Sequence, residues 1–150
     1  MRAAGLGVFM GFILIDLAFD LESMAGDVSS SKPFYFARAR HGVASRLILL
    51  GPLFLTLVLQ LIACWRHRLP EDIFALALNI AANCGGAYVL VKRKEMEAAA
   101  PEEVPLLLAA IGYAHVAMLP LALSAVLLAH RAELEVTRRS VTLNKQRKVS

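Results

Sequence analysis

The chain has three long stretches in which no Asp, Glu, Lys or Arg occurs. These uncharged stretches are Leu47–Trp65, Ile73–Val91 and Val104–Ala129. A helix that crosses a bilayer needs about 20 predominantly apolar residues, so each stretch is long enough to span a membrane. A fourth apolar run, Ala3–Leu21, is interrupted only by Asp16 and Asp20. The sequence therefore predicts an all-α protein, an integral membrane bundle of four transmembrane helices joined by short loops.

Charged residues are scarce and unevenly placed. They make up 19% of the 150 residues, against about 25% in an average soluble domain, and they gather in blocks between the apolar runs. Four spans and their connections use almost the whole chain, which predicts a single transmembrane domain over residues 1–150. Within it we expect spans at about 3–21, 47–65, 73–91 and 104–129, an interfacial segment at about 32–44 and a basic tail at 131–150.

The chain also lacks the residue patterns that hold metals or activate nucleophiles. The spacings H-x-x-x-H, E-x-x-H and C-x-x-C do not occur, and there is no glycine-rich phosphate loop. The two cysteines, Cys64 and Cys84, are expected roughly 16 Å apart in depth at the rise of an α-helix, which argues against a disulfide. The sequence predicts no catalytic residues, no metal and no cofactor, and it favours a protein that is not an enzyme.

A few polar side chains lie inside the predicted spans, where exposure to lipid is costly. They are Asp16, Gln60, Asn79, Asn83 and His115. We expect Asp16, Asn79, Asn83 and His115 to converge as one buried polar cluster. An Asp16–His115 pair could relay protons or bind a headgroup, and the alternative is interhelical hydrogen bonding, worth roughly 0.6 kcal/mol on average. Asp20, one turn nearer the end of its span, is expected to reach the headgroups.

Small residues indicate where two helices approach each other closely. Gly7 and Gly11 make a G-x-x-x-G step in the first span, and Gly85 and Gly86 are neighbours in the third. Both pairs are therefore expected to lie in helix–helix contacts.

Aromatic and basic residues lie together between the first two spans, which is typical of the membrane–water interface. The predicted interfacial residues are Phe34, Tyr35, Phe36, Arg38, Arg40 and, at the end of the second span, Trp65. The segment either anchors the next span or forms a lid that contacts lipid. The tail at 131–150 is basic but has no aromatic residue that could stack on a base, so it predicts contact with lipid headgroups and not with nucleic acid.

Together these features favour a non-catalytic structural or accessory subunit of a larger membrane protein complex, with membrane lipids and other membrane subunits as partners. The alternative is a small lipid-handling or solute- or proton-translocating protein that uses the buried Asp/Asn/His cluster. An even number of spans places both termini on one side of the membrane. Arg147 and Lys148 form a weak dibasic retrieval signal, and we expect an organellar host membrane, either the mitochondrial inner membrane or the endoplasmic reticulum.

Overall fold

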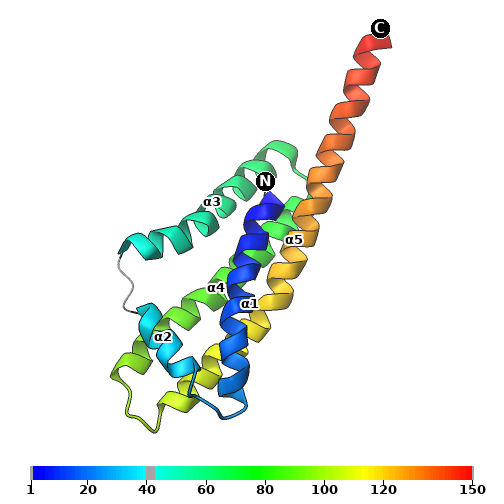
Figure 1. Cartoon of the computed structure of the whole chain (residues 1–150). Coiled ribbons are helices and arrows are strands. Elements are labelled where there is room, and N and C mark those ends of the chain that lie inside the picture. Colours follow the sequence, from blue (N-terminus) through cyan, green and yellow to red (C-terminus); the bar gives the residue numbers. More distant parts are fainter. Residues whose placement is uncertain (1, 40–42, 150) are drawn as a thin grey trace.

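The computed structural model describes residues 2–39 and 43–149, and within these ranges it contains α-helices and turns but no strand. The helices are α1 (Arg2–Met24), α2 (Ser31–Ala39), α3 (Val43–His67), α4 (Pro70–Ala98) and α5 (Val104–Val149). α1 and α4 both pack against α5, α2 lies at one end of this bundle, and α3 runs back toward the end at which α1 begins (Figure 1). The all-α prediction is confirmed.

Three helices are long and apolar enough to cross a membrane. The apolar part of α1 is Ala3–Met24, that of α4 is Pro70–Ala98, and that of α5 is Val104–Asn144. In α3 the described apolar part, Phe54–His67, is shorter than a span. The chain is thus consistent with an integral membrane protein, and three of the four predicted spans coincide with helices that are able to cross.

Local sequence explains where α4 begins and ends. Pro70 lies in the first turn, where its missing N–H costs nothing. The acidic residues Glu71 and Asp72 follow it, as the positive end of the helix dipole favours. Only Arg68 and Leu69 separate α4 from α3. The helix stops before Pro101, which cannot continue it.

α5 is the central helix of the bundle, and its buried residues alternate at spacings of four and three, the heptad repeat of coiled coils. They are Val104, Leu108, Ile111, His115, Met118, Ala122, Ala125, Ala129 and Ala132. The same repeat governs the buried residues of α1 from Leu6 to Asp20 and of α4 from Asp72 to Met96. Because this spacing keeps to one side of a helix, each helix packs through a single face.

Contacts at the two ends of the bundle define the direction of its helices. At one end Leu6 and Ala75 pack with Ala129, and toward the other end Met96 packs with Val104. Residue numbers rise together along α1 and α4 and fall along α5, so α1 and α4 are parallel to each other and antiparallel to α5. α1 begins at the end from which α5 projects (Figure 1).

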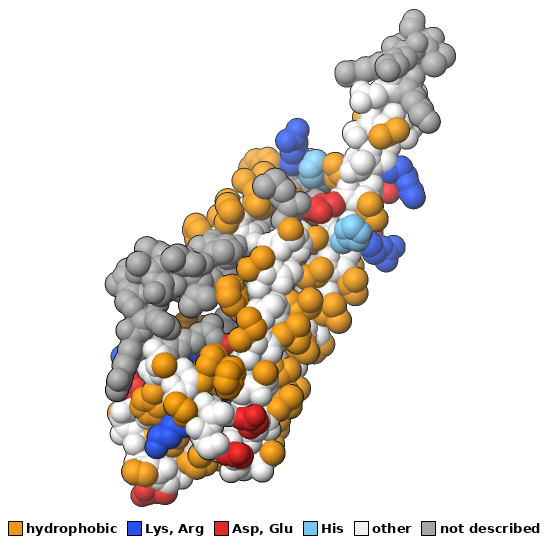
Figure 2. Space-filling view, in the orientation of Figure 1, with side chains coloured by type: hydrophobic (Ala, Val, Ile, Leu, Met, Phe, Trp, Pro, Cys, Tyr) orange, Lys and Arg blue, Asp and Glu red, His pale blue; other side chains and the backbone are white. Residues whose placement is uncertain are grey.

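The bundle has polar side chains inside and large apolar side chains outside. Its buried polar residues are Asp16, Asp20, Ser23, Ser31, Thr56, Gln60, Asp72, Asn79 and His115. On the outside, Phe54, Trp65 and Leu106 are all more than two-thirds exposed, and apolar side chains cover much of the visible middle of the molecule (Figure 2). Water-soluble proteins show the opposite arrangement. A lipid environment accounts for it, because polar side chains in a membrane face the bundle interior.

The glycine predictions need correction. An added Cβ at Gly85 would lie 2.5 Å from Met118, so this glycine is in a close α4–α5 contact. At Gly7, Gly11 and Gly86 an added Cβ would meet no described atom within 4 Å. The reason is that the buried face of α1 follows the heptad from Leu6, and the G-x-x-x-G step lies beside that face.

Two other glycines make the close approaches that the G-x-x-x-G step was expected to make. An added Cβ at Gly5 would collide with the Thr56 hydroxyl, which marks a close α1–α3 contact. One at Gly112 would lie 2.9 Å from Met24 and 3.1 Å from the Cβ of Asp20, which marks a close α1–α5 contact.

Candidate functional site

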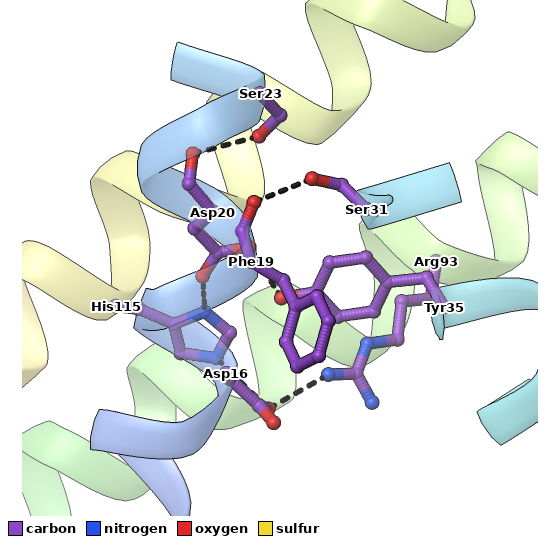
Figure 3. Close-up of polar contacts among 8 residues, drawn as sticks. All are labelled: Asp16, Phe19, Asp20, Ser23, Ser31, Tyr35, Arg93 and His115. Atoms are coloured by element: carbon purple, nitrogen blue, oxygen red, sulfur yellow. Dashed lines mark hydrogen bonds and ion pairs between the residues drawn. The ribbon is translucent and has the colours of Figure 1, made fainter. Parts of the chain in front are cut away.

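A group of charged side chains is buried between α1, α2, α4 and α5, and Asp20 lies at its centre. The Asp20 side chain is fully buried. One carboxylate oxygen, Oδ2, lies 2.5 Å from Nδ1 of His115 on α5, and the other, Oδ1, accepts a hydrogen bond from the hydroxyl of Tyr35 on α2 (Figure 3). A single carboxylate of α1 therefore connects three helices.

Asp16, one turn before Asp20, lies on the other side of the imidazole. Its Oδ2 accepts a hydrogen bond of 3.0 Å from Nη2 of Arg93 on α4, and the same oxygen lies 3.6 Å from Nε2 of His115. The imidazole therefore lies between two carboxylates, each facing one of its ring nitrogens (Figure 3). We call Asp16, Asp20, Tyr35, Arg93 and His115 the ionic cluster.

α2 covers the ionic cluster and is held there by three kinds of contact. The Arg93 guanidinium lies over the Tyr35 ring, 4.6 Å from its centroid, a favourable cation–π arrangement. Phe34 stacks on Phe19 of α1 at a centroid distance of 4.0 Å. Ser31, in the first turn of α2, donates a hydrogen bond to the backbone carbonyl of Phe19. These contacts fix α2 over the end of α1.

Burial raises the pKa of the Tyr35 hydroxyl above its ordinary value, and the negative charge of Asp20 raises it further. The hydroxyl therefore keeps its proton and acts as a donor to Asp20.

A second polar group lies between α3 and α4. Asn83 donates a hydrogen bond of 2.9 Å to Oδ1 of Asn79, and Asn79 donates one of 2.7 Å to Oε1 of Gln60. The Nε2 of Gln60 is buried, with no hydrogen-bond partner among the described residues. This amide chain stabilises the packing of α3 on α4, because hydrocarbon offers no other partner for its polar atoms.

The four residues predicted to form one polar cluster therefore lie in two groups. Asp16 and His115 are together in the ionic cluster, whereas Asn79 and Asn83 belong to the amide chain. The α4 residue that reaches Asp16 is Arg93, fourteen residues after Asn79, which is about 21 Å along a helix. The prediction of a single cluster failed because the sequence does not reveal how far α4 is displaced along α1.

The interfacial residues also differ from expectation. Tyr35, predicted to contact lipid, is fully buried, and its hydroxyl donates a hydrogen bond to the buried carboxylate of Asp20. Phe34 and Phe36 are half-buried and pack against the hydrophobic core cluster to which Tyr35 belongs. Trp65 is 85% exposed, and its role as an interfacial anchor stays a prediction. Arg40 lies outside the described residues, as does the side chain of Arg38.

Sequence reasoning missed three members of the ionic cluster: Asp20, Tyr35 and Arg93. For Asp20 a signal existed, since residues four apart share a helix face with Asp16 already expected inside. Arg93 is the middle residue of Lys92-Arg93-Lys94, and nothing in that run distinguishes it. In the described part of the chain, no group of three or more His, Cys, Asp or Glu side chains could hold a metal ion.

Comparison with known protein families, with curated proteins and with solved structures found no match to this chain. Its function is therefore argued from the geometry above.

Proposed function

We propose that this protein is a non-catalytic structural or accessory subunit of a larger membrane assembly, and that it presents the end of α5 to a partner. The observation that carries the proposal is the length of α5, which continues to Val149 beyond the bundle (Figure 1). Described side chains from Thr137 to Asn144 are all exposed. The projecting segment, residues 137–149, is about 20 Å long at the rise of a helix.

The projecting segment has the composition of a helix that contacts something outside the bundle. Arg139 pairs with Glu135 at 2.9 Å, one turn earlier, a pairing that supports an exposed helix weakly. Val141 is 49% exposed and Leu143 is 59% exposed. A helix without a packed face gains little stability of its own in water, so a partner surface is the natural support for this one.

The ionic cluster supports a scaffolding role. Each carboxylate in it, and each ring nitrogen of His115, already faces a polar group of another helix. Such a network fixes helices relative to one another, and of its described polar atoms the Nε of Arg93 is buried without a hydrogen-bond partner. Removing one member of a buried charge network is strongly destabilising, so the network favours a rigid bundle that holds α5 at a constant angle.

We further propose that α3 is a fourth crossing. α1 and α4 are parallel, so the chain between them has to return along the bundle, and α3 makes that return. Among its described side chains, Thr56, Gln60 and Ala63 are buried, whereas Phe54, Leu55, Leu61 and Ile62 are exposed. A helix that is polar toward the bundle and apolar outside is suited to lipid. Four crossings place both termini on one side.

Truncation after Val136 tests the proposed role of the projecting segment. Tagged full-length and truncated chains are extracted in mild detergent and separated by native size. We expect the full-length chain to migrate with a large complex and the truncated chain to migrate alone. Because the removed side chains that the structure describes are exposed, both should melt at the same temperature, which is the control for folding. Migration of both chains as the same small species would refute the proposal.

A second candidate function is translocation of a proton or small solute, or handling of a lipid, through the ionic cluster. The position of the His115 ring between Asp16 and Asp20 favours it, since a ring that faces two acceptors can hand a proton from one to the other. Proton flux into proteoliposomes, followed with an enclosed pH dye, tests this function. Asp20→Asn keeps the shape and removes the charge, so it should abolish a flux that depends on the cluster.

The organellar location, either the endoplasmic reticulum or the mitochondrial inner membrane, stays a proposal as well. Fractionation of cells that carry an internally tagged chain would place it in the endoplasmic reticulum, the mitochondrial inner membrane or another membrane. Recovery in a membrane other than these two would contradict it.

A further inference from the structure

Two grooves open on the last turns of α3 and share a wall. One, with a volume of about 580 Å³, is lined by Leu61, Ile62, Trp65 and Arg66. The other, of about 470 Å³, lies between α3 and α5, with Leu59, Ile62, Ala63 and Val136 as its apolar wall. Ile62 and Arg66 line both. Volumes of this size are in the range of pockets that hold small organic ligands.

The polar residues of the second groove gather at the end of α3. Arg66 and His67 close the groove on the α3 side, and Glu133 and Thr137 close it on the α5 side. The grooves are therefore apolar along α3 and charged where α3 ends. An apolar groove with a charged end matches a phospholipid, whose acyl chains are apolar and whose phosphate lies at the membrane surface.

Trp65 places this end of α3 at the level of the headgroups. It is 85% exposed, and a tryptophan at the end of an apolar helix is typical of the membrane–water interface. Arg66 follows it directly, so the guanidinium lies at the depth at which a long basic side chain reaches lipid phosphates. On the visible face, basic and histidine side chains also gather where α5 leaves the bundle (Figure 2).

The charge around the grooves favours an anionic lipid. The end of α3, the residue after it and α5 from Arg131 to Arg139 carry five arginines, namely Arg66, Arg68, Arg131, Arg138 and Arg139. They stand against two glutamates, Glu133 and Glu135, and the first turn of α4 adds Glu71 and Asp72. Arg138 and Arg139 are both within salt-bridge distance of Glu135, and the arginines outnumber the glutamates. A lipid with a net negative headgroup gains more from this surface than a zwitterionic one.

We propose that Arg66 binds the phosphate of an anionic phospholipid whose two acyl chains lie in the two grooves, on either side of Ile62. The site is independent of the ionic cluster, which lies toward the opposite end of α5. Thr137, at the start of the projecting segment, lines the second groove, whereas Arg66, Ile62 and Trp65 all belong to α3.

Trp65 provides a direct assay, because it is the only tryptophan of the chain. The full-length protein is reconstituted into phosphatidylcholine vesicles that contain a fixed fraction of either brominated phosphatidylglycerol or brominated phosphatidylcholine. Bromine on the acyl chain quenches tryptophan fluorescence at short range. We expect brominated phosphatidylglycerol to quench Trp65 at several-fold lower mole fraction, and the quenching to saturate. Arg66→Gln should lower this preference by about fivefold, the change expected from one charge at an anionic surface.

Lys94→Gln is the matched control, since it removes one exposed positive charge near the opposite end of the bundle. It should leave the preference unchanged. Equal quenching by the two brominated lipids, or quenching that rises linearly without saturation, would mean that Trp65 meets only bulk lipid and would overturn the proposal. An equal effect of Lys94→Gln and Arg66→Gln would do the same. The saturation measurement uses the unaltered chain, so it decides the matter even where Arg66→Gln does not fold.

Discussion

The pair formed by Arg93 and Asp16 allows the energetic role of the ionic cluster to be measured. The two side chains are only 14% and 6% exposed, and their contact is 3.0 Å. Removing one partner of a buried pair costs about 3–5 kcal/mol. Because the Arg93 side chain is still 14% exposed, we expect Arg93→Gln to cost less, about 2–3 kcal/mol of unfolding free energy. The loss arises because the Asp16 carboxylate stays buried without its guanidinium.

A double-mutant cycle separates this pair from the rest of the bundle. Asp16→Asn alone leaves Arg93 without its carboxylate, whereas the double variant leaves neither charge. The double variant should therefore be more stable than the sum of the single losses predicts, by about 1–3 kcal/mol. The assay is titration with SDS in mild detergent micelles, read by the thiol reactivity of a cysteine placed at Ala82, which is fully buried. Cys64 and Cys84 are replaced by serine in every variant.

The neighbouring residue provides the control. Lys92 also forms a salt bridge, at 2.7 Å to Glu95, but these side chains are 25% and 46% exposed. Exposed pairs on a helix contribute little, so Lys92→Gln should leave the SDS midpoint almost unchanged. The reasoning would be refuted by equal midpoint shifts for Lys92→Gln and Arg93→Gln, or by strict additivity in the cycle, because either result would mean that burial gives the Arg93–Asp16 pair no special role.

Two further predictions concern the covering helix and the close glycine contacts. Tyr35→Phe removes the hydroxyl that donates to Asp20. We expect a loss of about 1–3 kcal/mol of unfolding free energy and faster amide hydrogen exchange in α2, and unchanged exchange there would show that this hydrogen bond does not hold α2 on the bundle. Gly5→Leu should destabilise the bundle because its side chain would collide with Thr56, whereas an added Cβ at Gly11 meets no described atom within 4 Å. Equal melting temperatures for the two variants in detergent would show that the α1–α3 contact at Gly5 is not close.

The sequence alone is sufficient to predict that the protein is helical and apolar and that Asp16 and His115 lie inside. Both predictions depend on composition, because a charged residue in a long apolar run has few alternatives to the bundle interior. The burial of Asp20 could not be predicted in the same way. It depends on which element covers the end of α1, and here α2 covers that end with Tyr35. Composition carries no information about that distant contact.

Partner choice among the polar residues was not predictable for a related reason. Asn79 and Arg93 are both on α4, and the sequence alone allows either of them to face Asp16. The choice is decided by the displacement of α4 along α1, which follows from packing the whole heptad faces together. Likewise, Gly11 and Gly85 are equally small, but among the residues that the structure describes only Gly85 meets a neighbouring helix closely. Position around a helix, and not residue type, determines which glycine makes a contact.

The apolar faces of the helices do not by themselves determine how far one helix is displaced along another. Along α5 the buried residues repeat every seven positions and several are alanine, so a shift by one heptad, about 10 Å, would still place small residues against small residues. Such a shift would bring Leu108 or Ala122 to the position of His115. Asp20 would then lose the ring nitrogen that faces it, at the cost of a buried charge without a partner. The alanine-rich face of α5 does not select one alignment of the helices. The ionic cluster favours the observed alignment over those shifted by a heptad, as single buried polar residues do in coiled coils.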